Sequence, residues 1–443
     1  MAFLDQTVVN VALPTLGREL DAGLAGLQWT VDAYLLTLGA LLLLGGALGD
    51  SYGRRRIFLM GLGWFAAASA LCALAPSIEL LVAARAFQGI GAALLVPGSL
   101  AILRGAFLPD EQGKAIGLWA GLSGVTTALG PLLGGWLVEA VSWRAIFFIN
   151  VPLAGLAIWA AAGCVPELRG RTAAARLDLL GAATVSAGLG GIVFALTEGP
   201  ASGWRPLCVG IAGCISLALF FVVERRAENP MLPLGIFGSK RFSGANAATL
   251  AVYFGLGGSM FLVVLQLQSV VGFSPLLSGA ALMPLTALLL VLSPLAGRLS
   301  SQIGPRPLMT LGPLVASAGL ALLAGVGAGA FYPTDVLPGV GLLGLGLGLT
   351  VAPLTTAVLT SVSQEVAGAA SGVNNAIARI AGLLAVAALP ALGGMEGADF
   401  ADPRAFSEGY RRAMLAAAAI CGAGGLISLA TIGGEERGPP GRQ

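Results

Sequence analysis

The stretch that decides the fold is Gly45–Arg56, GGALGDSYGRRR, which closes an apolar run with three consecutive arginines. A second stretch, LAGRLSSQIGPRP at Leu295–Pro307, also follows an apolar run and reaches a basic turn. The two stretches align at four positions: Gly46 with Gly297, Leu48 with Leu299, Gly53 with Gly304 and Arg55 with Arg306. Such a repeat indicates two related halves, an organisation that builds transporters with the cargo path between the halves.

The composition places most of the chain in a membrane. Of its 443 residues, 56% are hydrophobic and 10% are charged, whereas soluble proteins carry about 25% charged residues. Apolar runs recur at the length that a helix needs to cross the ~30 Å hydrocarbon core, and they lack the alternating polarity of β-barrel strands. We predict an all-α polytopic membrane protein with fourteen helices near residues 1–17, 27–48, 57–75, 80–103, 114–138, 146–165, 178–197, 206–223, 243–270, 276–297, 308–330, 336–360, 369–392 and 411–432.

The repeat divides these helices into two six-helix bundles with two helices inserted between them. We expect an N-terminal half at 1–165 and a linker at 166–242 that holds the inserted helices and a cytoplasmic loop. A C-terminal half at 243–432 and a cytoplasmic tail at 433–443 follow. Most of the 24 lysines and arginines fall on the side of Arg54, and positive residues stay preferentially in the cytoplasm. We therefore expect a multi-pass protein of the cytoplasmic membrane with both termini inside.

Several function classes lack the residues they need. There is no histidine, and the five cysteines lack C-x-x-C spacing, so metal sites and imidazole catalysis have little material. No G-x-x-x-x-G-K-[ST] loop occurs, which argues against direct ATP drive. The net charge of +2 gives no reason to expect a nucleic-acid partner. We predict that the protein is not an enzyme and holds no metal or cofactor.

Three motifs carry candidate functional residues. In the turn at 46–56, Gly46 permits close helix approach and Gly53 permits a tight turn. Asp50 can pair with an arginine or with a helix N-terminus. The alternative is that the arginines only anchor this turn on the positive, cytoplasmic side of the membrane. In the fourth helix, Arg85 and Gln88 share a face, and Arg85 either has a functional partner or extends to the interface. In the fifth helix, a stripe of small residues lets a neighbour approach closely, at Gly117, Gly121, Gly124, Ala128, Pro131 and Gly135.

Two aspartates lie in apolar runs near the start of the chain. Asp5 precedes Asn10 by five residues, about 140° around a helix, so the two cannot both point into one cavity. A carboxyl group outside water favours its neutral form and can load and release a proton; a helix cap is the alternative for Asp5. Asp32 lies between Trp29 and Tyr34, which suits a lipophilic cation but also a solvated aspartate at the membrane interface.

Further polar residues in the thirteenth helix can line the path in the second half, namely Asn374, Asn375 and Arg379. Only four residues precede Asp5, and a helix over 1–17 measures about 25 Å, which is short for a bilayer. We therefore expect the natural chain to begin further upstream.

These motifs, in this order, resemble motifs A, B and C of the major facilitator superfamily, although Ser51 stands where motif A usually has arginine. The opening LDQTVVNVALP (4–14), WRAIFFINVP (143–152), SGVNN (371–375) and the helix count resemble the EmrB/QacA-type drug:proton antiporters with 14 transmembrane helices. The resemblance implies a gating role on the cytoplasmic side for Gly46, Asp50, Gly53, Arg54 and Arg55. It implies proton coupling for Arg85, with Gln88 on the same face. It implies an antiporter helix at Gly130, Pro131, Gly134 and Gly135.

The resemblance predicts a proton-coupled multidrug or natural-product efflux antiporter that works by alternating access, with the proton gradient as its energy source. We expect an amphipathic small-molecule cargo, with a cationic one as an option, and a monomer in the lipid bilayer. Asp5, Asn10, Asp32 and Arg85 are the expected coupling and path residues in the first half. A proton-linked exporter of a specific metabolite or siderophore is the alternative, and a channel or receptor would not need the two-half repeat.

Overall fold

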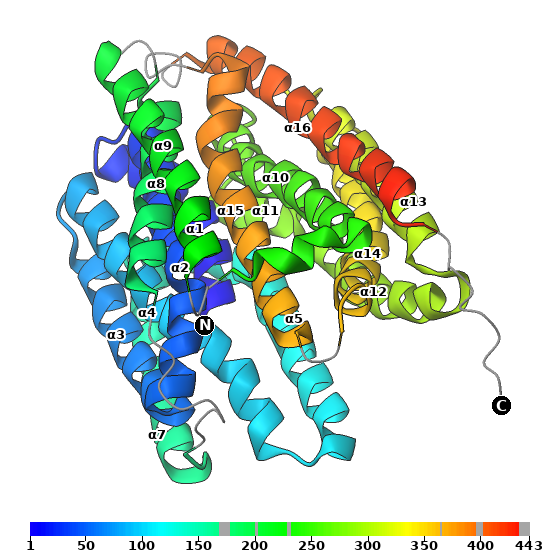
Figure 1. The fold of residues 1–443 in the computed structure, drawn as a ribbon. Helices are drawn as coiled ribbons and strands as arrows, with labels where there is room; N and C mark the ends of the chain where they lie inside the picture. Colours follow the sequence, from blue (N-terminus) through cyan, green and yellow to red (C-terminus); the bar gives the residue numbers. More distant parts are fainter. Residues whose placement is uncertain (168–177, 200–202, 228–231, 364–365, 396–401, 434–443) are drawn as a thin grey trace.

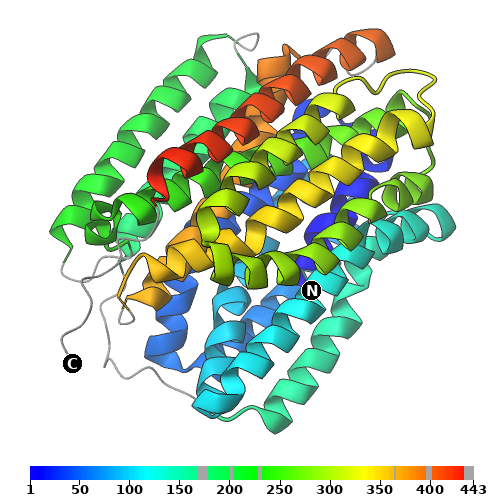
Figure 2. The same cartoon turned by 90° about the vertical axis from the view of Figure 1, so that its right-hand side faces the viewer.

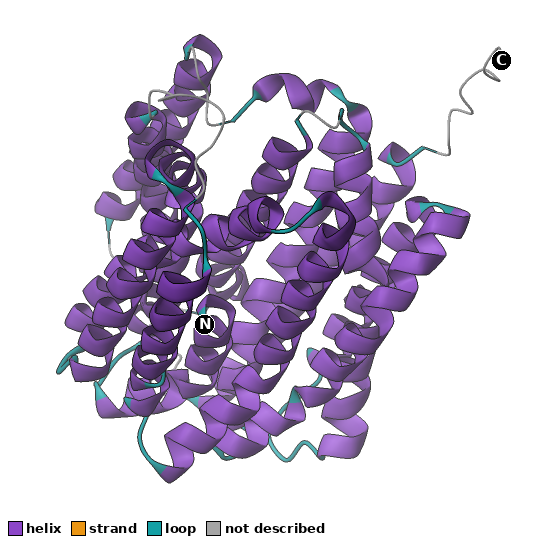
Figure 3. Cartoon of the chain, turned by 90° about the horizontal axis from the view of Figure 1, so that it is seen from below, coloured by secondary structure: helices purple, strands orange, loops and turns teal. Residues whose placement is uncertain are grey.

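The computed structural model describes residues 1–443 except 168–177, 200–202, 228–231, 364–365, 396–401 and 434–443. The predicted tail at 433–443 therefore lies outside the described residues except for Gly433, as do parts of the predicted linker. The described residues form helices and connecting loops, with no strand among them (Figure 3). This confirms the prediction of an all-α fold.

The first bundle holds the helices of the N-terminal half. They are α1 (Ala2–Glu19), α2 (Leu24–Tyr52), α3 (Arg54–Leu74), α4 (Ile78–Ala106), α5 (Pro109–Ala140), α6 (Ala145–Phe148) and α7 (Asn150–Cys164). The short α6 and the longer α7 together take the place of one predicted helix.

The inserted pair and the second bundle follow. The pair is α8 (Leu179–Glu198) and α9 (Trp204–Arg226), and a short 3₁₀ turn, η2 (Leu234–Gly238), comes before the bundle. The bundle holds α10 (Lys240–Ser269), α11 (Pro275–Ala281), α12 (Met283–Ile303), α13 (Pro305–Leu323), η3 (Tyr332–Val336), α14 (Leu337–Thr360), α15 (Ala367–Gly393) and α16 (Pro403–Thr431). In Figure 1 the inserted pair lies on the flank of α2, and α13 and α16 form the opposite flank.

The lengths and surfaces of the helices fit a bilayer. Thirteen described helices are long and apolar enough to cross a membrane. The remaining predicted span, α1, carries Asp5, Arg18 and Glu19 and is largely buried among its neighbours. Large apolar side chains point outward, including Trp159 at 75% and Trp204 at 72% exposure. Such a surface suits hydrocarbon rather than water.

Some predicted boundaries were wrong. The predicted connection at 393–410 is helical from Pro403 onward, because Asp402 accepts a hydrogen bond from the Arg404 amide (2.9 Å) and caps α16. A proline at the first helical position suits this start. The predicted helix at 308–330 ends at Leu323, where a glycine-rich connection begins. The Asp402 cap thus sets the start of α16, and α13 ends where the glycine-rich connection begins.

The two repeated turns have the same local structure. Gly53 and Gly304 both have positive φ, +109° and +81°, a conformation that favours glycine. Two residues later, Arg55 donates to the Ala162 carbonyl at the end of α7, and Arg306 donates to the Leu429 carbonyl at the end of α16 (2.8 and 3.1 Å). The equivalent arginines of the two turns thus bind equivalent places, the last turn of α7 in the first half and the last turn of α16 in the second.

Contacts between the halves concentrate at the helix ends opposite the Gly53 turn. Gln28 of α2 donates to the Val386 carbonyl of α15 (2.8 Å), and Gln268 of α10 donates to the Val11 carbonyl of α1 (2.9 Å). Figure 2 shows α12 to α16 packed in front of the N-terminal helices. On the Gly53 side, Asn375 of α15 is exposed. The halves are therefore held together mainly at one end.

Candidate functional site

The site begins with a buried ion pair inside the N-terminal bundle. Asp5 of α1 is 1% exposed and Arg85 of α4 is 1% exposed. Arg85 Nη1 lies 2.6 Å from Asp5 Oδ2. Two opposite charges at this depth are tolerated because each compensates the other. The alternative of a helix cap for Asp5 and that of an Arg85 extending to the interface are both excluded by this placement.

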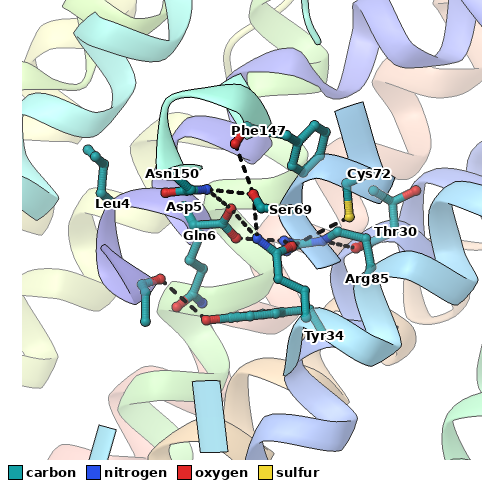
Figure 4. Close-up of polar contacts among 12 residues, drawn as sticks. Leu4, Asp5, Gln6, Thr30, Tyr34, Ser69, Cys72, Arg85, Phe147 and Asn150 are labelled. Carbon is teal, nitrogen blue, oxygen red and sulfur yellow. Dashed lines mark hydrogen bonds and ion pairs between the residues drawn. The ribbon is translucent and has the colours of Figure 1, made fainter. Parts of the chain in front are cut away.

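The second oxygen of the Asp5 carboxylate is also fully engaged (Figure 4). Asp5 Oδ1 accepts hydrogen bonds from Gln88 Nε2 and Asn150 Nδ2, both at 2.8 Å. The same two amides donate to Ser69 Oγ (3.1 and 3.0 Å), and Ser69 donates to the Phe147 carbonyl (2.9 Å). The carboxylate is thus bonded directly by side chains of α4 and α7, and Ser69 of α3 holds the two amides in place. Such a connected network stabilises the charge of Asp5.

Arg85 is fixed as closely as its partner. Its Nε donates to the Thr30 carbonyl of α2 (3.0 Å) and its Nη1 to Gln88 Oε1 (2.5 Å). The guanidinium carbon lies 4.3 Å from the centre of the Tyr34 ring, a geometry that adds cation–π attraction. The Asp5–Arg85 cluster, defined as Asp5, Ser69, Arg85, Gln88 and Asn150, therefore joins α1, α3, α4 and α7.

Asn150 and Ser69 are functional candidates that the sequence interpretation missed. Asn150 is the first residue of α7, directly after the break that ends α6. It lies in the quoted stretch at 143–152, where a polar residue beside Pro152 in an apolar run was the available signal. Ser69 carried no comparable signal, because one serine in an alanine-rich helix is common.

Asp32 is buried at the junction of three helices. It is fully buried and neither carboxylate oxygen has a hydrogen-bond partner among the described residues. One turn earlier, Trp29 donates to Glu198 of α8 (3.3 Å), and Gln28 donates to α15. Residues three and four apart share a helix face, so Asp32 lies between α8 and α15. The solvated interfacial position considered for it is wrong.

Asn10 does not join the Asp5–Arg85 cluster. Its Oδ1 atom is buried without a hydrogen-bond partner among the described residues, and its side chain is half-buried. The expected angular separation of Asn10 from Asp5 on α1 agrees with this placement.

The three residues expected to line the path in α15 have different surroundings. Asn374 donates to Asn246 Oδ1 (3.1 Å) and Thr249 Oγ1 (2.7 Å) of α10 and so ties two helices of one bundle together. Asn375 is exposed. Arg379 reaches across to the other bundle, where its Nη1 donates to Gln6 Oε1 of α1 (2.8 Å).

In the turn at 46–56, the side chain of Arg54 makes its hydrogen bonds within the N-terminal bundle. Arg54 Nε, at the start of α3, lies 2.8 Å from Asp50 Oδ1 near the end of α2. Arg54 Nη1 donates to the Ala101 carbonyl of α4 (3.0 Å). The close approach of a neighbouring helix that was expected at Gly46 occurs at Gly45 instead, where α4 packs against α2. A methyl group added at Gly45 would lie 2.0 Å from the Ala93 oxygen, whereas one at Gly46 would make an ordinary 3.7 Å contact with Pro97.

The small residues of α5 bring three helices together. A methyl group added at Gly130 would lie 1.9 Å from Thr7 Oγ1, and one at Gly134 would lie 3.0 Å from the Val8 backbone, both on α1. One added at Gly135 would lie 2.5 Å from the Pro275 oxygen of α11. A methyl group added at Gly279 of α11 would lie 2.1 Å from the Pro131 oxygen of α5. Side chains at these positions would push α5 away from α1 in its own bundle and from α11 in the other bundle.

No group of three or more histidine, cysteine, aspartate or glutamate side chains that could hold a metal ion occurs among the residues described.

A family model described as the Major Facilitator Superfamily matches residues 1–386. The chain belongs to this superfamily. The resemblance to drug-exporting members is confirmed by relatives of known name. The multidrug resistance protein Stp of Mycobacterium tuberculosis (strain CDC 1551 / Oshkosh) is 37% identical over 88% of this chain and 73% of its own. The tetracenomycin C resistance and export protein of Streptomyces glaucescens is 36% identical over 88% and 73%.

A third relative, the puromycin resistance protein pur8 of Streptomyces alboniger, is 39% identical over 88% of this chain and 78% of its own. Among solved structures, a bacterial homologue of the lysosomal transporter Spinster in an inward-facing, unoccupied conformation has a TM-score of 0.69 at 17% identity. That likeness covers 97% of this chain and 93% of that one, and it concerns the fold alone. The protein is a multi-pass superfamily transporter of small molecules, related to resistance exporters, and not an enzyme.

Proposed function

We propose that the protein is a proton-coupled efflux antiporter of amphipathic small molecules that works by alternating access. The observation that carries this proposal is the buried Asp5–Arg85 pair. Ionisable residues inside a membrane protein are costly and mark ion or proton paths. The names of the relatives, which are resistance and export proteins, support the efflux direction.

The Asp5–Arg85 cluster can couple proton binding to helix movement. A proton on Asp5 would remove the charge that compensates Arg85 and would free Arg85 to seek another partner. Uncompensated, a buried member of an ion pair costs about 3–5 kcal/mol. That energy can shift an equilibrium between two arrangements of α1 against α4. Asp32, buried beside the inserted helix α8, is our second proton-carrying candidate.

The distribution of contacts suggests which side this conformation opens to. The halves meet mainly at the ends opposite the Gly53 turn, and the arginines predict that this turn is cytoplasmic. We therefore take the conformation to be open towards the cytoplasm, with 1–165 and 243–432 as the moving halves and 166–242 bridging them. Both termini are then inside, and we take the unit to be a monomer.

The cargo class follows from chemistry and from the relatives. Tetracenomycin C and puromycin occur in the relatives' names, which supports an antibiotic-like, amphipathic cargo. Relatives named for single antibiotics also favour the second candidate, an exporter of one specific metabolite or siderophore. A panel of structurally unrelated compounds separates the two, because the multidrug form transports several of them.

The test is transport by purified protein in liposomes with an imposed pH gradient. We expect fluorescent cargo to accumulate only while the gradient lasts, and an outward cargo gradient to move protons the opposite way, read with an internal pH dye. An ionophore that collapses the gradient should stop accumulation, and protein-free vesicles are the control. Accumulation that ignores the gradient, or a current independent of cargo, would contradict the proposal and favour a channel.

We predict that replacing Asp50 by asparagine slows turnover several-fold while the cargo affinity stays near that of the unmodified protein. Asp50 and Arg54 are partly exposed, so their pair adds at most about 1 kcal/mol to stability, and its main effect is on gating. Glu408→Gln is a matched control, because Glu408 and Arg412 form an exposed pair with the same spacing and the same 2.8 Å distance. Equal effects of both variants on turnover would remove the gating role.

A further inference from the structure

Arg379 is a cation near the middle of α15 that has only neutral partners. Its Nη1 atom donates to Gln6 Oε1 (2.8 Å), and its guanidinium carbon lies 4.8 Å from the centre of the Phe3 ring. Both partners belong to α1, in the other bundle. A charged group at this depth costs several kcal/mol unless it is paired or hydrated.

The carboxylate that lies next to Gln6 is not available to Arg379. Asp5 is occupied by Arg85, Gln88 and Asn150 and is almost fully buried. No salt bridge of Arg379 occurs within the described part of the chain. A guanidinium has five N–H donors in a planar fork, and only one of those of Arg379 is used by a hydrogen bond among the described residues. The remaining donors can take an acceptor from outside the protein.

A polar stripe leads to Arg379 from the Gly53 side. Ser371, Asn375 and Arg379 follow one another at four-residue spacing and so share a face of α15. Asn375 is exposed, and Ser371 and Arg379 are half-buried. A polar group entering at the open end can therefore follow this face to the guanidinium.

We propose that Arg379, with Gln6 and Phe3, is a subsite for the anionic group of an aromatic cargo, such as a carboxylate or phenolate beside a ring. This inference rests on the proposed export function and names its cargo class. The guanidinium fork pairs with planar anions in two-pronged geometry, and the Phe3 ring offers a face for an aromatic body. A cationic cargo would meet Arg379 unfavourably, and Asp32, which suited a cation, is fully buried.

Two dyes with the same xanthene ring system but opposite charge test this proposal. Binding of fluorescein (anionic) and rhodamine 123 (cationic) to the purified full chain is measured by fluorescence polarisation at equal pH on both sides, so that no proton gradient is involved. We expect the unmodified protein to prefer fluorescein. Arg379→Gln should weaken fluorescein binding at least about tenfold, Arg379→Lys should weaken it less, and rhodamine binding should not fall in either variant.

The exposed Arg411 of α16 supplies the control, since Arg411→Gln should leave fluorescein binding unchanged. Thermal unfolding of each variant separates loss of binding from loss of fold, and the charge-keeping lysine variant retains a readout if the glutamine variant unfolds. The subsite is refuted if the unmodified protein fails to bind fluorescein or prefers rhodamine. It is also refuted if the Arg379→Gln variant binds fluorescein as well as the unmodified protein does. Failure of the export proposal is distinct, because intact fluorescein binding would then accompany no gradient-driven transport.

Discussion

Asp5→Asn is expected to reduce pH-gradient-driven transport to the level of protein-free vesicles and to lower stability by about 3–5 kcal/mol. Asparagine keeps the shape of the side chain but cannot exchange a proton. It also leaves Arg85 buried without a counter-charge, because the other partners of that guanidinium are the Thr30 carbonyl and the neutral side chains of Gln88, Tyr34 and Phe147. Stability would be read by thermal unfolding in detergent and transport by dye accumulation in liposomes.

A double variant separates the structural part of this loss from the functional part. Asp5→Asn with Arg85→Gln removes both charges, and replacing a buried pair by neutral groups is often close to neutral for stability. We expect the double variant to recover most of the unfolding temperature but none of the coupled transport. Recovery of transport together with stability would mean that the pair only holds the bundle together.

For the Asp5–Arg85 pair, the sequence was enough to select both residues but not to show that they are in contact. A charged residue in a membrane helix must have a partner, and the chain offers few acidic residues at this depth, so Asp5 and Arg85 could both be selected before their contact was known. The helix count and the two basic turns were predictable for a similar reason, since bilayer thickness and positive charge constrain sequence directly. The sequence did not predict that Arg55 and Arg306 would contact the last turns of α7 and α16.

Neutral polar residues were harder to select than charged ones. Asn150 donates to Asp5 and Gln6 accepts from Arg379, but an amide in an apolar run can equally satisfy a neighbouring backbone group, as Gln268 does. Helix rotation was the second limit. The aromatic neighbours of Asp32 suggested an interface position, whereas the packing of α8 on α2 turned that face inward. The aromatic residues around Asp32 fit both a buried and an interfacial position, and the packing of the inserted helix α8 decides for the buried one.

For Asp32 we expect Asp32→Asn to lower gradient-driven transport at least about tenfold, equal to about 1.4 kcal/mol, without loss of stability. Both Asp32 oxygens are buried and lack hydrogen-bond partners among the described residues. An unpaired charge in such a position is very costly, and a proton removes that cost. A residue kept at a cost to the fold is expected where function requires it. Asparagine keeps the volume and removes the ionisable group.

Asp32→Leu extends this test, because an apolar side chain of similar size leaves no buried polar atom and should raise the unfolding temperature while transport stays low. Asp335→Asn is the matched control, since Asp335 is exposed at the same end of the molecule and its substitution should leave transport unchanged. The proton-carrying role predicts that stability and transport move in opposite directions at position 32. If both fall together in the two variants, Asp32 serves to pack α2 against α8 and α15, and coupling must depend on the Asp5–Arg85 cluster alone.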